Sequence, residues 1–321
     1  MKIIANLICL DSAPELPDLL ASLKGNVDAV VAIDGGSTDN TVGILENWGR
    51  DSGVPVTCRV NPWPDDFAQQ RNLCLDVTRA TYPPDADTDV WVLMIDTDDK
   101  LVEFDRVFAE DAARKAGVGG LMCRMDNSNG FFHVLQFFRL TPESRWENPI
   151  HEYVTISGPR GLPPAGKLTI KRGYSSRHAK DPERNVRIGR RFVEASPNNS
   201  RGRFYLARDL IECGVLPKQS RMAEAEGHLR AYLAMTTNFV EQDRYARLMM
   251  VRLLCDNGRV AEAREMLLQS LAKDPDNRSC YEALARISDG KESDVWQRLA
   301  ASAEGSCVMP YASRLPEKAG H

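Results

Sequence analysis

The chain has 321 residues, of which 43% are hydrophobic and 27% are charged, and its formal net charge is −4. This composition is typical of a globular protein of about two domains and excludes a disordered or collagen-like chain. The negative net charge argues against a protein that coats nucleic acid. The longest apolar run, residues 90–95, is far shorter than the ~20 residues of a membrane helix. Acidic residues and proline follow too early for a signal peptide, so we expect a cytoplasmic protein.

The first half alternates short apolar runs with stretches of helical spacing. Strands are predicted at residues 2–10, 29–33, 55–60 and 89–95, and helices at 16–23, 42–48 and 67–79. This alternation predicts an α/β domain with a Rossmann-like, mostly parallel sheet and helices on its faces. From residue 121 to 174 the pattern changes to β-runs without long helices.

The second half is predicted to be helical, with helices at residues 185–195, 201–213, 222–235, 241–256, 260–273 and 278–287. Two similar segments occur in it, each with a glycine (Gly214, Gly258) followed by a helix that begins with Ala-Glu-Ala. This pattern is typical of tetratricopeptide-like helical hairpins, which stack and share a core. We therefore expect an α/β domain over residues 1–184, a helical repeat domain over 185–305 and a flexible tail over 306–321.

The first polar motif follows the apolar run that ends at residue 33. Asp34 comes at the end of this strand, and two glycines, Ser37, Thr38 and Asp39 follow. Ligands bind at the carboxyl ends of strands in open α/β sheets, so Asp34 is placed to accept a hydrogen bond from a nucleobase. Asp39 or Thr38 is expected to cap the next helix, and Asp39 is also a candidate for nucleotide binding.

The second motif ends the strand at residues 89–95. Asp96 and Asp98 point to the same side if the chain stays extended. Two carboxylates on one side repel each other unless a cation lies between them. Oxygen ligands at an open site suit Mg²⁺ or Mn²⁺ shared with a phosphate. Asp96 as the nucleophile of a phosphohydrolase is the alternative.

Arg71 and Asn72 lie in the predicted helix between these two motifs, where either residue could face a nucleotide. The charges are also unevenly distributed. Residues 85–112 hold ten acids and two bases, whereas residues 171–203 hold ten bases and three acids. A basic loop of this kind could neutralise a diphosphate, with Lys180 and Arg184 best placed to do so.

Taken together, these three segments resemble family 2 glycosyltransferases of the GT-A fold, and the resemblance covers about residues 1–180. The appended repeats resemble a bacterial and phage branch in which tetratricopeptide-like helices follow such a domain. One departure is Gly35, where the family often has a second acid after the position of Asp34.

The resemblance implies roles for individual residues. Asp34 would contact the base of a nucleotide sugar, Asp96 the ribose or the metal, and Asp98 the metal that bridges the diphosphate. Glu152 would act as the general base and His151 would orient it or bind substrate. His178 would complete the metal shell. Phe131, Phe132, Arg139 and Trp146 are acceptor-side candidates, with core packing favoured for the two phenylalanines.

The resemblance implies metal-dependent, inverting transfer of a sugar from a nucleotide sugar, with a UDP-sugar as donor and Mn²⁺ or Mg²⁺ as cofactor. The acceptor would be a peptide, a glycan or another nucleophile, docked by the helical domain. That domain could also bind a second copy of the chain, and a nucleic-acid base is a less favoured acceptor. Two alternatives stay open: a metal-dependent phosphohydrolase that uses Asp96, and a non-catalytic repeat scaffold.

Overall fold

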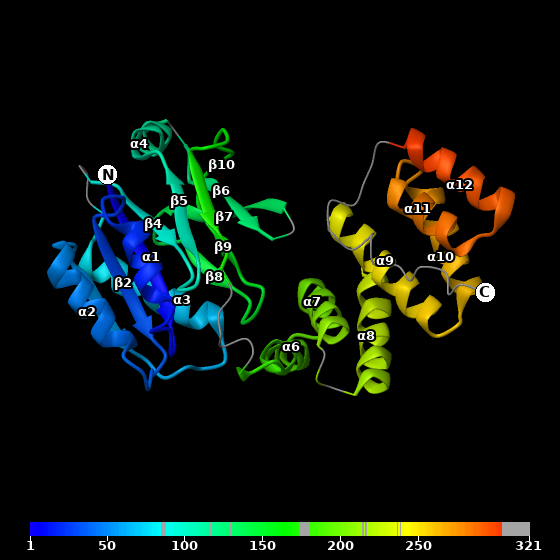
Figure 1. Cartoon of the computed structure of the whole chain (residues 1–321), viewed down its shortest axis with the longest axis horizontal. Coiled ribbons are helices and arrows are strands. Elements are labelled where there is room, and N and C mark those ends of the chain that lie inside the picture. Colours follow the sequence, from blue (N-terminus) through cyan, green and yellow to red (C-terminus); the bar gives the residue numbers. More distant parts are fainter. Residues whose placement is uncertain are drawn as a thin grey trace. The chain divides into compact units, whose positions relative to one another are not determined.

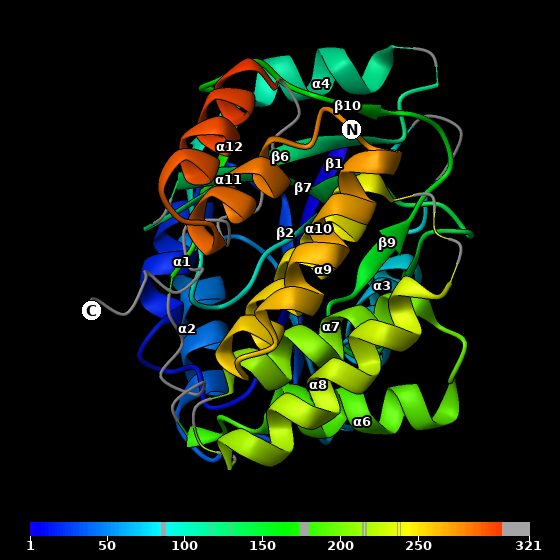
Figure 2. The ribbon, with the colours of Figure 1, turned by 90° about the vertical axis from the view of Figure 1, so that its right-hand side faces the viewer.

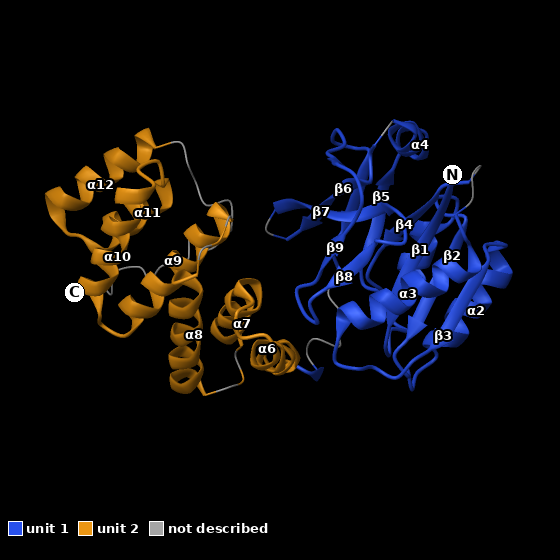
Figure 3. Cartoon of the chain, turned by 180° about the vertical axis from the view of Figure 1, so that it is seen from behind, with its two compact units in different colours: residues 1–181 blue, residues 182–321 orange. Residues whose placement is uncertain are grey.

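The computed structural model describes residues 1–84, 88–115, 117–128, 130–173, 180–213, 215, 217–235, 237 and 239–303. The chain divides into two compact units, Met1–Asp181 and Pro182–His321 (Figures 1 and 3). The first unit contains the sheet, and the second unit is helical.

In the described part of the first unit, nine strands form one sheet in the order β3-β2-β1-β4-β7-β6-β11-β5, with β10 paired to β6. The strands are β1 (Lys2–Cys9), β2 (Ala29–Asp34), β3 (Val56–Val60), β4 (Val90–Met94), β5 (Lys100–Phe104), β6 (Gly120–Asn127), β7 (Gly130–Arg139), β10 (Arg160–Gly161) and β11 (Leu168–Lys171). From β3 to β4 the neighbours are parallel. Because β7 is antiparallel to both β4 and β6, the rest of the sheet is mixed. The α/β fold expected from the sequence is confirmed.

Helices cover both faces of this sheet. They are α1 (Leu16–Leu23), α2 (Thr41–Ser52), α3 (Phe67–Thr81) and α4 (Arg106–Arg114). Ile3 and Ala5 of β1 pack in one cluster with α1, α2 and α4, whereas Ile4 packs with α3 on the opposite face. Successive strand residues point to opposite faces, so this central strand is buried on both sides.

A small hairpin lies on the same face as α3. Its strands β8 (Arg145–Glu147) and β9 (Tyr153–Thr155) pair antiparallel, with Trp146 opposite Val154. Both of these residues are buried in the α3 cluster, and α3 contacts β8. The loop between the two strands is therefore held close to the start of α3.

Four described elements of the first unit were missed from the sequence: β5, α4 and the short strands β8 and β10. β5 is the edge strand of the sheet, and Leu101 is its only buried residue, so it lacks the apolar run of an inner strand. α4 begins where the Asp105 side chain accepts a hydrogen bond from the Phe108 N–H, and three alanines form its buried face.

The described part of the second unit contains α6 (Arg184–Ala195), α7 (Ser200–Glu212), α8 (Lys218–Leu233), α9 (Val240–Asp256), α10 (Val260–Lys273), α11 (Arg278–Ile287) and α12 (Gly290–Ser302). Successive helices pack on each other, with α7 against α8, α8 against α9 and α9 against α10 (Figure 2). The six predicted helices are confirmed. α12 was missed because it buries only Ala300, which gives little apolar periodicity.

The repeat pattern read from the sequence has a packing reason. Ala225 of α8 and Ala263 of α10 are both fully buried in the shared helical core. Gly258 follows α9 with φ of 72°, a conformation that glycine adopts without steric cost. None of the described helices combines the length and the apolar character that crossing a membrane requires.

Candidate active site

Three loops meet at the carboxyl ends of β1, β2 and β4. An Asp11 Oδ1 atom accepts a hydrogen bond of 2.7 Å from the Thr38 N–H, which joins the first two loops. The Ser12 N–H donates to Thr41 Oγ1 at 2.7 Å. The Thr97 hydroxyl donates to Ser12 Oγ at 3.1 Å and brings in the loop after β4. This rim is the edge at which open α/β sheets bind ligands.

Asp34 lies inside the rim and is only 1% exposed. Its Oδ2 atom accepts hydrogen bonds from the N–H groups of Gly36, at 2.9 Å, and Ser37, at 2.8 Å. The Ser37 hydroxyl donates to its other oxygen. The carboxylate therefore shapes its own turn, and its contact with a nucleobase stays a prediction.

Asp39 supports the start of α2. Its two carboxylate oxygens accept hydrogen bonds of 3.0 Å from the N–H groups of Thr41 and Ala13. Slight burial opposes ionisation, but a hydrogen bond from the Thr41 hydroxyl and the two from backbone N–H groups lower the pKa of Asp39 below its usual value. The predicted capping is confirmed, although Asp39 acts from the residue before Asn40, the N-cap position. A contact with a nucleotide stays a prediction.

The acids after β4 do not continue an extended strand. β4 ends at Met94 and residues 97–98 form a turn, so the premise that placed Asp96 and Asp98 on the same side is wrong. Asp99, which the sequence analysis missed, is 2% exposed and accepts a hydrogen bond from the Gly173 N–H at 3.1 Å. Burial, then the negative charges of Asp96 and Asp98, raise the pKa of Asp99 to about 8. Asp96, Asp98 and Asp99 thus lie in one acidic turn, in which burial and the neighbouring carboxylates favour the protonated form of Asp99.

Arg71 of α3 connects this turn to the β8–β9 loop. Its Nη2 atom donates to Asp96 Oδ1 at 2.8 Å, and its Nε atom donates to Glu152 Oε1 at 2.7 Å. Arg71 is 5% exposed, and its guanidinium lies 5.0 Å from the centre of the Trp146 ring. Burial opposes the charge, but the carboxylates of Asp96 and Glu152 outweigh it and raise the pKa of Arg71.

The sequence analysis suggested that Arg71 could face a nucleotide. The structure places its guanidinium between two carboxylates, and contact with a nucleotide stays a prediction. Asp96 and Glu152, which the sequence singled out separately, are bound to one side chain. Nothing local in the sequence indicates this connection, because Arg71 and Glu152 are 81 residues apart.

Asn72 binds the backbone of the hairpin. Its Nδ2 atom donates to the Trp146 carbonyl at 2.9 Å, and its Oδ1 atom accepts from the Trp146 N–H at 2.8 Å. Both ends of the side-chain amide are thus engaged by one residue of β8. These bonds give Asn72 a role in positioning the hairpin, and its contact with a nucleotide stays a prediction.

Glu152 and His151 lie in the loop between β8 and β9. The Glu152 side chain is 12% exposed. His151 and Asn148 have φ angles of 52° and 70°, in the left-handed region that non-glycine residues rarely adopt. The Pro149 carbonyl accepts a hydrogen bond of 2.9 Å from the Phe67 N–H at the start of α3. Such strained loops persist only where the surrounding contacts fix them, and they cluster at functional sites.

The acceptor-side candidates have burial opposite to expectation. Phe131 and Phe132, expected in the core, are 56% and 39% exposed on β7. Trp146 is 4% exposed and packs below Arg71. Arg139 forms an ion pair with Asp89 at 3.4 Å. Tertiary packing, which the apolar count of the β7 segment does not show, decides which aromatic side chains are buried.

The charged segments contribute less to the site than the sequence indicated. Asp105 pairs with Lys167 at 2.6 Å, and Arg106 pairs with Asp28 and Glu110, so part of the acidic run is neutralised locally. Lys180 is exposed, and Arg184 begins α6 in the second unit. Their contact with a diphosphate stays a prediction, and His178 lies outside the described residues.

Part of a metal site fits this turn. Within the described ranges, no group of three or more His, Cys, Asp and Glu side chains is arranged to hold a metal ion. Mg²⁺ bound with a nucleotide takes only one or two carboxylates and completes its shell with phosphate and water oxygens. Asp96 and Asp98 fit that donor set. A cation bound there would balance the negative charges of Asp96 and Asp98, which add to burial in raising the pKa of Asp99.

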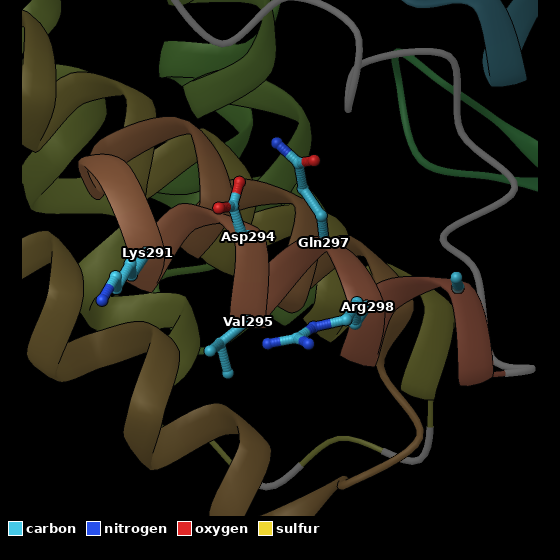
Figure 4. Close-up of a pocket in the computed structure, with 6 residues that line it drawn as sticks. Lys291, Asp294, Val295, Gln297 and Arg298 are labelled. Carbon is cyan, nitrogen blue, oxygen red and sulfur yellow. The ribbon is translucent and has the colours of Figure 1, made fainter.

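A separate pocket lies along α12 in the second unit (Figure 4). Its described lining consists of Lys291, Asp294, Val295, Gln297, Arg298 and Ala301. All six residues come from this one helix, and none is a candidate from the sequence. The acids of the first unit are therefore the candidate chemical site.

Comparison with known proteins follows the division into two units. Residues 7–107 match the model of glycosyl transferase family 2, and residues 218–287 match a tetratricopeptide repeat model. The first unit therefore contains a segment that is similar to family 2 glycosyl transferases. The tetratricopeptide match falls within the helical unit, as the resemblance implied.

Individual relatives are distant from this chain. A TPR repeat-containing protein of Synechococcus elongatus is 28% identical over 155 residues, which are 47% of this chain and 35% of that protein. The chain thus covers about a third of the length of that curated relative. A crystal structure of TarS from S. aureus has 15% identity and a TM-score of 0.38, covering 94% of this chain and 91% of its own.

A second solved structure covers less of the chain. It is glucosyl-3-phosphoglycerate synthase from Mycobacterium tuberculosis in complex with Mn²⁺, UDP and glucosyl-3-phosphoglycerate. It has 21% identity and a TM-score of 0.26, and covers 39% of this chain and 44% of its own.

Proposed function

We propose that the first unit transfers a sugar from a UDP-sugar to a nucleophile of an acceptor, with inversion at the anomeric carbon. One observation carries this proposal: Arg71 binds both Asp96, at the end of β4, and Glu152, in the β8–β9 loop. A donor-side acid and a second acid are thus joined in one site, within the domain that matches glycosyl transferase family 2.

On the donor side, Asp96 and Asp98 would hold a Mn²⁺ or Mg²⁺ ion. When bound, that ion would supply Lewis-acid stabilisation of the diphosphate leaving group. The chain's own contribution is the negative turn at residues 96–99, fixed by the hydrogen bond from the Gly173 N–H to Asp99. Lys180 and Arg184 are proposed to balance the charge of the diphosphate, and Asp34 and Asp39 to shape the nucleotide side of the rim.

On the acceptor side, Glu152 would take the proton of the attacking hydroxyl or thiol. A general base must come within about 2.6–3.2 Å of the group that it deprotonates. Glu152 is mostly buried, but it lies in a loop and keeps 12% of its side chain exposed. A single displacement places this base on the face opposite the leaving group, which is the reason for proposing inversion. His151 would orient Glu152 or bind the acceptor.

The helical unit is proposed to dock the acceptor or a partner protein, since tetratricopeptide repeats present extended surfaces for binding. The match to glycosyl transferase family 2 favours this reading over the phosphohydrolase and the non-catalytic scaffold. Acceptor identity and pairing with a second copy are open to direct measurement.

The test is a panel of nucleotide sugars added to the full chain with MnCl₂, with MgCl₂ or with EDTA. Thermal unfolding reports binding, and UDP release reports turnover. We expect a UDP-sugar with Mn²⁺ to raise the melting temperature and to release UDP slowly. Asp98→Asn removes the metal-dependent rise, whereas the matched control Asp111→Asn, on the exposed side of α4, keeps it.

Glu152→Gln separates binding from chemistry in the same assay. It keeps the metal-dependent rise but lowers UDP release by roughly 10²–10⁴-fold, the usual contribution of a general base. Glu147→Gln on β8 is its control. Phosphate release from a simple phosphoester without any sugar donor would instead indicate the phosphohydrolase. Absence of any response to nucleotides would indicate the scaffold.

A further inference from the structure

We propose that Arg71 is a positioning residue that fixes Glu152 relative to Asp96, so that the acceptor-side base and the donor-side acid keep a constant spacing. This inference rests on the proposed function. It differs from the role that the sequence predicted for Arg71, which was a contact with the nucleotide.

The guanidinium of Arg71 has a geometry that suits it to this role. Its Nε and Nη2 atoms bind two different carboxylates, at 2.7 Å and 2.8 Å. These donors belong to one rigid planar group, so they set the distance between the two acceptor oxygens. A lysine ammonium is a single point on a flexible chain and lacks this fixed spacing.

Arg71 is itself held in place by burial and by its neighbours. It is 5% exposed and its guanidinium lies over the Trp146 ring. The next residue, Asn72, holds both backbone polar groups of Trp146. Two neighbouring residues of α3 thus hold the hairpin. Asn72 binds the backbone of Trp146, and Arg71 contacts the Trp146 ring and binds Glu152.

Glu152 needs such a support because it lies in a loop. Glu152 is in a five-residue loop, at residues 148–152, in which two residues have positive φ. A buried ion pair is by itself weak evidence for stability, because apolar side chains in its place are often as stabilising. Displacing a catalytic group by about 1 Å costs roughly 10²-fold in rate. Positioning of the base therefore explains a buried arginine between two carboxylates.

The experiment is a double-mutant cycle with Arg71→Lys and Glu152→Gln in the full chain. UDP release from the best UDP-sugar of the panel gives kcat and the donor KM, and calorimetry with UDP and Mn²⁺ gives binding without turnover. Arg79→Lys is the matched control. Arg79 is on the same helix, and its guanidinium donates to the carbonyls of Thr141 and Ser144, away from the acids.

We expect Arg71→Lys to lower kcat by about 10²-fold, the cost of a displaced catalytic group, with UDP affinity within about threefold of the wild type. Combined with Glu152→Gln, it should slow the reaction by less than about threefold more, since a residue that acts through Glu152 has no effect once that base is gone. Arg79→Lys should leave kcat unchanged.

Trp146→Leu provides a second route if Arg71→Lys does not fold. This variant keeps Arg71, Asp96 and Glu152 but removes the ring that lies against the guanidinium. We expect the same loss of kcat as in Arg71→Lys, and no such loss when Glu152→Gln is already present. Independent, multiplying effects of Arg71→Lys and Glu152→Gln would overturn the proposal. So would weaker UDP binding at unchanged kcat, which would restore the nucleotide contact. If the wild type releases UDP and the variants give either of these two results, only the role of Arg71 is contradicted. If the wild type releases no UDP, the proposed function and the role of Arg71 are both contradicted.

Discussion

Arg71 and Arg259 each bind a pair of carboxylates, in very different surroundings. Arg71 of the first unit joins Asp96 and Glu152, and its side chain is 6% exposed. Arg259 of the helical unit joins Glu226 and Glu262, and its side chain is 39% exposed. The hydrogen bonds have similar lengths, so the difference between the two clusters is the water around them.

Burial changes what such a cluster means. At the surface, water screens the charges, and ion pairs contribute little to stability. In the interior, both desolvation and the attraction between charges are larger, so removing one partner leaves an uncompensated buried charge. The cluster around Arg259 is therefore a surface feature of the repeat unit. The buried cluster around Arg71 belongs to the candidate site.

The sharpest test of this comparison is Arg71→Met. It leaves Asp96 and Glu152 close together without their shared cation, and we expect a loss of about 3–5 kcal/mol in the free energy of unfolding. Urea unfolding followed by circular dichroism measures it. A loss no greater than that of the equivalent surface variant would show that the two clusters do not differ.

A smaller effect is expected from Asn72→Ala. This change leaves the N–H and carbonyl of Trp146 without their side-chain partner and should cost about 1–3 kcal/mol, the usual penalty for an unsatisfied buried group. The same urea experiment reads it. Because the hairpin that carries Glu152 loosens, UDP release should also fall. Unchanged stability would mean that water replaces the amide without cost.

The smallest effect is expected from Arg259→Met in the repeat unit. Glu226 keeps its contact with Arg230 at 2.7 Å, and all of these groups reach solvent. We therefore expect a melting temperature close to that of the wild type, and UDP release equal to it. A marked drop in melting temperature would show that the surface network matters more than its exposure indicates.

The two units also differ in how well the sequence predicted them. The repeat helices follow local rules: Ala225 and Ala263 are buried where the repeated Ala-Glu-Ala places them, and Gly258 ends a helix. In the first unit the strands with continuous apolar runs were predicted, but the edge strand β5 was not. Asp99 was also missed, because burial of the last acid in Asp-Thr-Asp-Asp depends on the Gly173 backbone, which lies 74 residues away.

The sequence by itself determined the α/β order of the first unit, the helical repeats of the second, and the acids that end β2 and β4. Each of these depends on side-chain periodicity or on residues that are neighbours along the chain. Only the tertiary structure decided that Arg71 joins Asp96 to Glu152 and that Asn72 binds the backbone of Trp146. Those contacts arise because α3 and the β8–β9 hairpin pack on one face of the sheet, and that packing depends on long-range burial, which no local pattern encodes.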